Sequence, residues 1–116
     1  VYEYTIFFDD EQARRLLYPV LKNVSYTRWH PYFLDIVPEG LSKSYGAARI
    51  LERIGVTREE CMAFGDGGND IPIIEYAGIG VAMGNATDDV KAAADYVTDT
   101  VDEDGVVTAL QRFGVL

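Results

Sequence analysis

The sequence has very little cysteine and no hydrophobic run long enough to cross a membrane. Cys61 is the single cysteine among 116 residues, so no disulfide can form within the chain, and a reducing cytoplasm is the expected compartment. No apolar stretch approaches the roughly 18–20 residues that a membrane-spanning helix requires. These absences argue against a disulfide-stapled scaffold and against a membrane partner.

Positive charge is scarce in the second half of the chain. The net charge is −9, and residues 59–116 carry twelve acidic side chains against two basic ones. A domain this acidic repels phosphate backbones, so we expect no nucleic-acid partner. Most of the carboxylates are expected to form a solvated surface, whereas a few gathered at one place would bind a divalent cation.

The chain has the length of one domain and is short for an ordinary two-domain enzyme. Its composition, 48% hydrophobic and 25% charged, is typical of a globular protein. The sequence starts at Val1 rather than at methionine, which we take as a first indication of a fragment.

The first 37 residues predict a small unit of strands and one helix. Aromatic and β-branched residues favour three strands, at Val1–Phe8, Ser25–Trp29 and Tyr32–Val37. Asp9 or Asp10 is expected to cap a helix whose apolar positions continue to Leu21. A Pro-Glu-Gly stretch at 38–40 then marks the best boundary in the sequence.

From residue 42 onwards helices alternate with short apolar strands, which predicts an α/β fold with a parallel sheet. We expect helices at 42–54, 69–76, 87–94 and 103–113, and strands at 61–64, 79–83 and 96–97. Four apolar residues of the first helix share one face: Ala47, Ile50, Leu51 and Ile54. The continuous apolar run at 61–64 is typical of a strand that is buried on both faces.

A glycine-rich acidic loop, Gly65–Asp70, follows this apolar run and precedes a helix. Ligands of open parallel sheets bind beyond the carboxyl ends of the strands, so a site is expected at this loop. Asp66 and Asp70 offer hard oxygen ligands at a spacing that lets both face one Mg²⁺. Asn69 and the amides at the helix start are expected to meet a phosphate. The alternative is an ordinary turn in which Asn69 or Asp70 caps the next helix.

Two other kinds of ligand-binding loop do not match this stretch. An EF-hand calcium loop fails because its third position would be Gly68 and its twelfth Ala77, where oxygen ligands are needed. A P-loop fails because no Gly-Lys-Ser or Gly-Lys-Thr follows. Upstream, Lys43 begins a helix, where it is either a solvated residue or a point charge that reaches a phosphoryl group or a catalytic carboxylate.

Four segments together resemble the haloacid dehalogenase superfamily, specifically the Cof-type phosphatases with a large α/β cap. These segments are Pro38–Lys43, Gly65–Asp70, Ala82–Ala86 and Asp104–Val106. The resemblance implies that Lys43 is catalytic, because it holds the nucleophilic carboxylate and the phosphate. It further implies that Asn69 contacts the phosphate. Asp66 would bind the metal, and Asp70 would support the metal shell.

The same resemblance implies a larger architecture and an activity. Residues 1–37 would be the end of a cap domain, and residues 38–116 the C-terminal half of a Rossmann-like core. The implied reaction is Mg²⁺-dependent hydrolysis of small phosphorylated metabolites, such as sugar phosphates or nucleotide-like esters. His30 and Trp29 would either face the substrate from the cap remnant or serve in its core or linker.

The nucleophile motif of these phosphatases, Asp-x-Asp-Gly, has no good match in this sequence. Asp9-Asp10-Glu11 follows an apolar strand but lacks the second aspartate, and Asp102–Gly105 lacks a buried strand before it. We therefore expect a fragment of a larger enzyme, with negligible turnover by itself and a sheet edge exposed for self-association.

Two further alternatives concern function. One is a catalytically inactive truncated domain that acts only as a weak metal- or partner-binding module. The other is a receiver-like phospho-acceptor domain, which needs an acceptor aspartate on an early strand and the acidic pair before it. The order of the acidic residues here is wrong for a receiver.

Overall fold

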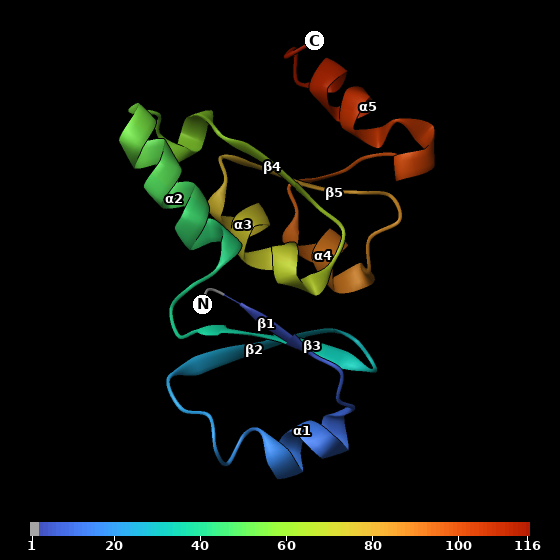
Figure 1. Ribbon diagram of the computed structural model, residues 1–116. Coiled ribbons are helices and arrows are strands. Elements are labelled where there is room, and N and C mark those ends of the chain that lie inside the picture. Colours follow the sequence, from blue (N-terminus) through green and yellow to red (C-terminus); the bar gives the residue numbers. More distant parts are fainter. Residues whose placement is uncertain (1–2) are drawn as a thin grey trace.

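The computed structural model describes residues 3–116, apart from the side chain of Trp29, and contains two sheets (Figure 1). The antiparallel sheet has the order β1-β3-β2, and the parallel sheet has the order β4-β5-β6. The strands are β1 (Tyr4–Ile6), β2 (Val24–His30), β3 (Phe33–Pro38), β4 (Met62–Gly65), β5 (Ile79–Ala82) and β6 (Tyr96–Val97). The parallel sheet confirms the predicted α/β class. Val1 and Tyr2, the start of the first expected strand, lie outside the described residues.

The antiparallel sheet is stabilised by one helix, α1 (Asp10–Leu16), which packs on one of its faces. Asp9 begins this helix with a capping box, in which its carboxylate accepts from the amide of Gln12 at 2.8 Å. Ala13 is fully buried against Leu34 and Ile36 of β3. These contacts form the apolar core of the first unit.

The predicted continuation of this helix to Leu21 is wrong. The helix ends at Leu16, and Val20 lies in a turn with 72% of its surface exposed. Pro19 supplies the physical reason, because it has no amide to donate and it disfavours helical backbone in the residue before it.

Helix α2 (Lys43–Ile54) begins and ends where the sequence predicts. The hydroxyl of Ser42 accepts from the amide of Tyr45 at 3.1 Å, and Gly55 ends the helix at a φ of +72°. Two of the four apolar residues that share one face are exposed, however: Ile50 is 63% and Ile54 is 62% exposed. Within the described residues the main neighbour of α2 is the short helix α3, which covers little of its surface.

Three helices flank the parallel sheet: α3 (Ile71–Tyr76), α4 (Asp88–Ala93) and α5 (Gly105–Arg112). Figure 1 shows α3 and α4 on one face and α5 on the other. Four buried residues form the core beneath α3 and α4: Ile74, Ala82, Ala86 and Val90. Strand β4 is fully buried only on the face of Ala63 and Gly65, and Phe64 on its other face is half-buried. The expectation that this strand is buried on both faces is therefore wrong, because the described residues cover the face of Met62 and Phe64 only in part.

The two sheets are joined between Pro38 and Lys43 (Figure 1). Polar side chains of the antiparallel sheet, among them Thr27 and Asp35, line a cavity together with Asn69 of the loop that follows β4. Among the described residues, no helix is both long and apolar enough to cross a membrane. The assignment of residues 1–37 to the end of a cap and of 38–116 to half of a core stays a prediction.

Candidate active site

Asp70 holds the loop after β4 through both oxygens of its carboxylate. Oδ2 accepts from the backbone amides of Asp66 at 3.1 Å and of Gly67 at 3.3 Å. Oδ1 accepts from Nζ of Lys43, and this ion pair joins the first residue of α2 to the residue before α3. The Asp70 side chain is only 9% exposed, whereas that of Lys43 is 51% exposed. A buried charge is thereby satisfied by three donors, and a half-exposed ammonium is fixed beside the loop.

The pKa of Asp70 lies below the ordinary value of an aspartate. Burial by itself raises this pKa, because it penalises the charged form. The bond from Lys43, the amides of Asp66 and Gly67, and the charge of Lys43 together outweigh the effect of burial. Asp70 is therefore ionised at neutral pH and keeps its contact with Lys43.

The loop can fold back over Asp70 only because Gly65 has no side chain. A Cβ at Gly65 would lie 2.4 Å from Cβ of Asp70 and 2.9 Å from Cδ1 of Ile74. A Cβ at Gly67 would lie 2.9 Å from Oδ1 of Asn69. Gly65 is thus required by the close approach of Asp70, whereas at Gly67 the end of the Asn69 side chain could move aside.

Asp66 differs from Asp70 in that its carboxylate is exposed and uncommitted, which means that it has no hydrogen-bond or ion-pair partner among the described residues. Within residues 3–116 only its backbone amide takes part in a hydrogen bond, and its side chain joins no ion pair. No cluster of three histidine, cysteine or acidic residues in the described part of the chain could enclose a metal by itself. Mg²⁺ commonly binds through one or two carboxylates and completes its shell with water and phosphate oxygens, so the Asp66 carboxylate fits that ion as one ligand.

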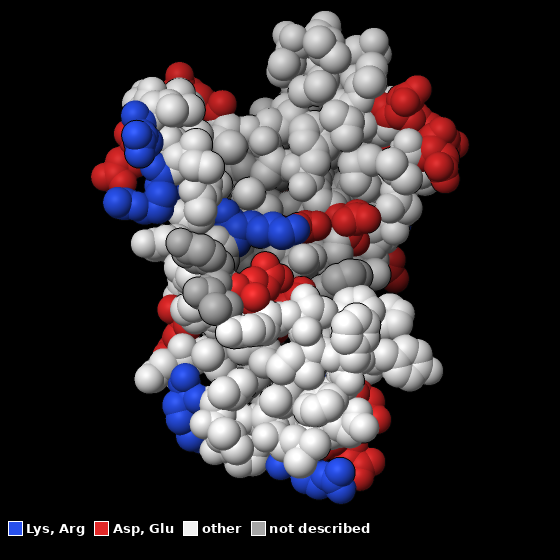
Figure 2. All heavy atoms as spheres, in the orientation of Figure 1, with Lys and Arg blue, Asp and Glu red and all other residues white. Residues whose placement is uncertain are grey.

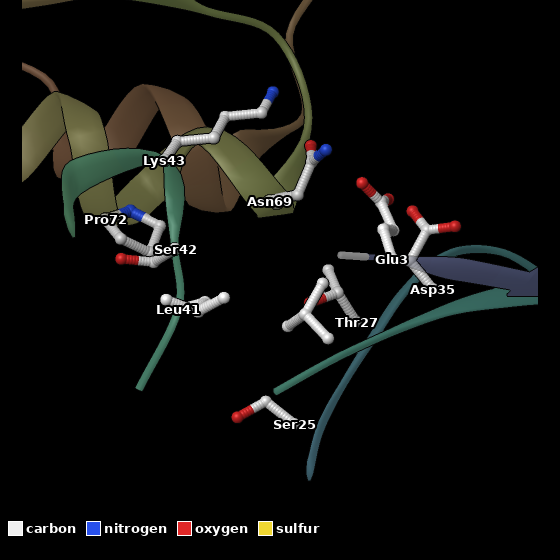
Figure 3. A pocket seen from close by; sticks show the side chains of 11 residues that line it. Glu3, Ser25, Thr27, Asp35, Leu41, Ser42, Lys43, Asn69 and Pro72 are labelled. Carbon is white, nitrogen blue, oxygen red and sulfur yellow. The ribbon is translucent and has the colours of Figure 1, made fainter. Parts of the chain in front are cut away.

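Two cavities meet at Lys43, Gly68 and Asn69, between the parallel-sheet unit and the antiparallel sheet. The loop cavity, of about 690 Å³, is further lined by Arg28, His30, Pro31, Asp66, Gly67, Asp70, Thr87 and Asp89. The sheet cavity, of about 380 Å³, is further lined by Glu3, Ser25, Thr27, Asp35, Val37, Leu41, Ser42 and Pro72 (Figure 3). Acidic and basic atoms lie side by side at this waist of the molecule (Figure 2).

Arg28 fixes the turn between β2 and β3 over the loop cavity. Its Nη1 lies within 3.0–3.3 Å of the carbonyl oxygens of Phe8, His30, Pro31 and Phe33. Its Nε and Nη2 are buried and find no hydrogen-bond partner among the described residues. Arg28 therefore ties the strand ends together on the side that faces Asp66.

The structure brings the four site residues predicted from the sequence, Lys43, Asp66, Asn69 and Asp70, to the same place. Their roles in catalysis and in phosphate and metal binding stay predictions. His30 lines the loop cavity and stacks on Phe33 at 4.6 Å between ring centroids, whereas the side chain of Trp29 lies outside the described residues.

The two stretches rejected as nucleophile motifs line neither cavity. Asp9 caps α1, and Asp104 adopts a φ of +55° immediately before α5. Both aspartates thus serve at helix starts, far along the chain from the Gly65–Asp70 loop.

Sequence reasoning missed the acidic and hydroxyl residues of the antiparallel sheet that line the sheet cavity, among them Glu3, Thr27 and Asp35. A signal for some of them exists in the second strand, where Ser25 and Thr27 alternate with Val24 and Tyr26. Such alternation predicts a polar face, but it does not identify what that face opposes.

Comparison with known proteins gives consistent matches. The sequence profile of one family, described as haloacid dehalogenase-like hydrolase, matches residues 1–110. The chain is 42% identical over 107 residues to the 5-amino-6-(5-phospho-D-ribitylamino)uracil phosphatase YcsE of Bacillus subtilis, covering 90% of this chain and 43% of that protein.

Two solved structures are closely similar to the chain. The phosphatase BT1666 of Bacteroides thetaiotaomicron has a TM-score of 0.91 and 47% identity, covering 99% of this chain and 42% of that one. The subclass IIB sugar phosphatase BT4131 has a TM-score of 0.91 and 45% identity, covering 100% of this chain and 44% of that one. The chain thus spans less than half the length of each of these three proteins.

Proposed function

The chain belongs to the haloacid dehalogenase-like hydrolases, a family with many phosphatases, and from this premise we propose that its site serves Mg²⁺-dependent hydrolysis of small phosphomonoesters. The observation that carries the proposal is the Lys43–Asp70 ion pair beside the uncommitted carboxylate of Asp66. This arrangement offers a cation, a metal ligand and an amide side chain around one cavity.

Lys43 and Asn69 would hold the phosphoryl group. The ammonium of Lys43 has three N–H donors, of which one is used by Asp70, and half of its side chain is exposed to the cavities. The amide of Asn69 lines both cavities and supplies further donors. Such fixed donors stabilise the negative charge of a phosphoryl group as its bond to the leaving group breaks.

Asp66 would hold the metal, and Asp70 would position the loop. When bound, Mg²⁺ acts as a Lewis acid that polarises a phosphoryl oxygen. Asp70 is poorly placed to be a direct ligand, because both of its oxygens already accept bonds from Lys43 and from two backbone amides. We therefore assign Asp70 a positioning role behind Asp66 and Lys43.

The names of two relatives support small phosphorylated metabolites as substrates. BT4131 is described as a sugar phosphatase, and YcsE is named as the phosphatase of a phosphoribityl compound. The chain shares more than 40% identity with each of them over the segment that contains the site.

The chain on its own is not expected to turn over phosphomonoesters. The carboxylates that line the two cavities are those of Glu3, Asp35, Asp66, Asp70 and Asp89, and none of them stands in an Asp-x-Asp-Gly motif. The purified chain should leave p-nitrophenyl phosphate intact in the presence of Mg²⁺. Hydrolysis that disappears in Asp66→Ala would contradict this expectation.

Binding of orthophosphate tests the site without requiring turnover. With Mg²⁺ present, orthophosphate should shift the backbone amide signals of Gly67 and Asn69 in the ¹H–¹⁵N spectrum of the chain. Lys43→Ala should weaken this binding about tenfold, through the loss of a charge-assisted donor. Lys22→Ala is the matched control, because Lys22 lines neither cavity. Equal binding by both variants would refute the assignment of Lys43.

A second candidate, a partner-binding module, is favoured by the outer edge of β4. Strand β4 pairs only with β5 among the described strands, and the exposed Ile50 and Ile54 of α2 add apolar surface to the same unit. An unpaired strand edge is a template for another chain. Size-exclusion chromatography would support this candidate by a concentration-dependent dimer, and a strict monomer would argue against it.

A further inference from the structure

The sheet cavity contains carboxylates to which the proposed mechanism gives no task. Strand β3 turns Leu34 and Ile36 towards α1, so Asp35 and Val37 point to the opposite face and line the cavity. On this strand the cavity wall therefore carries the carboxylate of Asp35 beside the apolar Val37.

Three polar side chains on this face of the sheet lie in register on neighbouring strands. Asp35 pairs with Thr5 of β1 and with Thr27 of β2, so the three side chains form one row across the sheet. The hydroxyl of Thr5 donates to Oδ1 of Asp35 at 2.7 Å, which fixes the carboxylate. Glu3 stands beside this row, and Figure 3 shows the carboxylates of Glu3 and Asp35 directed towards the side of Asn69.

The residues proposed to bind phosphate, Lys43 and Asn69, form the opposite wall of the sheet cavity. Lys43 and Asn69 line both cavities, so a molecule whose phosphoryl group lies against them can extend into the sheet cavity (Figure 3). The volume of about 380 Å³ lies at the lower end of ligand pockets, roughly 300–1,000 Å³, and so suits one small group. Leu41, Val37 and Pro72 provide apolar surface for its carbon chain.

We propose that Glu3 and Asp35 select the leaving group of the substrate: they accept hydrogen bonds from an uncharged, hydroxyl-bearing chain and reject a chain that carries a second anionic group. The selection rests on the proposed function, because it presumes that the phosphoryl group lies at Lys43 and Asn69. An ionised carboxylate is an acceptor only, so it binds hydroxyl donors but repels another carboxylate or phosphate. Specificity of this kind comes from the repulsive partner as much as from the attractive one.

Two probes of matched length test the selection. Sorbitol 6-phosphate and 6-phosphogluconate both have six carbons and a terminal phosphate, and they differ by a carboxylate at the far end. In titrations with Mg²⁺, followed by the amide signals of Thr27 and Asn69, the chain should bind sorbitol 6-phosphate at least about tenfold more tightly, a typical effect of one like charge at short range.

Asp35→Asn and Glu3→Gln should each narrow this preference about threefold to tenfold, mainly by improving the binding of 6-phosphogluconate. Both changes are nearly isosteric, so a dispersed spectrum should persist, and either variant serves if the other is poorly folded. Glu11→Gln on α1 is the matched control, because Glu11 is exposed, lines neither cavity and should keep the full preference.

Binding of orthophosphate distinguishes failure of the proposed selection from failure of the proposed function. If orthophosphate shifts the signal of Asn69 but the two probes bind equally in the unaltered chain, the selection by Glu3 and Asp35 is overturned and the proposed function stands. A preference that Asp35→Asn and Glu3→Gln leave unchanged also overturns the selection. If neither orthophosphate nor either probe shifts the signal, the proposed function is overturned and the selection with it.

Discussion

The loop after β4 and the polar face of the antiparallel sheet border the same cavity, yet they are built in opposite ways. In the loop, Asp70 is buried, three donors satisfy it, and Gly65 admits no side chain. On the sheet, the polar side chains of Thr27 and Asp35 are only partly buried and project into the cavity. The loop is therefore constrained by a buried charge and by close approach of its own atoms, whereas the sheet face presents partly exposed polar side chains to the cavity.

Loss of the Asp70 carboxylate should produce the largest effect on stability. Asp70→Ala leaves the amides of Asp66 and Gly67 and the ammonium of Lys43 without their acceptor, which should lower the free energy of unfolding by about 2–4 kcal/mol. Urea denaturation measures the change. The neighbouring Asp66→Ala should stay within about 0.5 kcal/mol, because its exposed carboxylate has no partner to lose. Equal losses in the two variants would erase the distinction between these aspartates.

A methyl group at Gly65 should be the next most damaging change. Gly65→Ala places a Cβ against Asp70 and Ile74, and relief of that overlap should cost about 1–3 kcal/mol in thermal or urea unfolding. Gly46→Ala is a matched control, because its Cβ would meet nothing within 4 Å inside α2. That substitution should stabilise the chain by roughly 0.5–1 kcal/mol.

Acid should lower the contribution that ionised Asp70 makes to the free energy of unfolding. Its pKa is lower in the folded chain than in the unfolded one, so its contribution to stability is complete above the ordinary aspartate pKa and is lost as the pH falls through the folded value. The stability difference between the unaltered chain and Asp70→Asn should therefore be greatest near neutral pH and shrink in acid. Urea midpoints of both proteins across this range measure it, and a difference independent of pH would show that the ion pair contributes nothing.

The smallest effect is expected on the sheet face. Thr27→Val keeps the size and β-branching of the side chain in β2, and its hydroxyl has no bond to lose among the described residues. The free energy of unfolding should change by less than about 0.5 kcal/mol. A loss comparable with that of Asp70→Ala would show that the sheet face is as constrained as the loop.

The same contrast explains how far the sequence could predict the structure. The loop could be predicted from the sequence because its glycines, Asp66 and Asp70 are close together in the chain. The helix that carries Lys43 could be predicted because Ser42 and Gly55 delimit it. The partnership of Lys43 with Asp70 spans 27 residues, so it required either the family resemblance or the structure.

Features that depend on tertiary contacts were beyond local patterns. The apolar period of α2 places four residues on one face, but burial of Ile50 and Ile54 needs a neighbour that residues 3–116 do not provide. Asn85, in the segment Ala82–Ala86, makes a contact that spans 16 residues of the chain. Its side-chain oxygen accepts from the amide of Val101 at 3.0 Å, a partnership that no local pattern reveals.

A crystal structure of the chain grown with Mg²⁺ and orthophosphate tests the central claim most directly. The division of roles predicts the ion at about 2.0–2.1 Å from a carboxylate oxygen of Asp66. Asp70 should remain bonded to Lys43 and to the amides of Asp66 and Gly67. An ion coordinated directly by Asp70, with those amide bonds broken, would contradict the account.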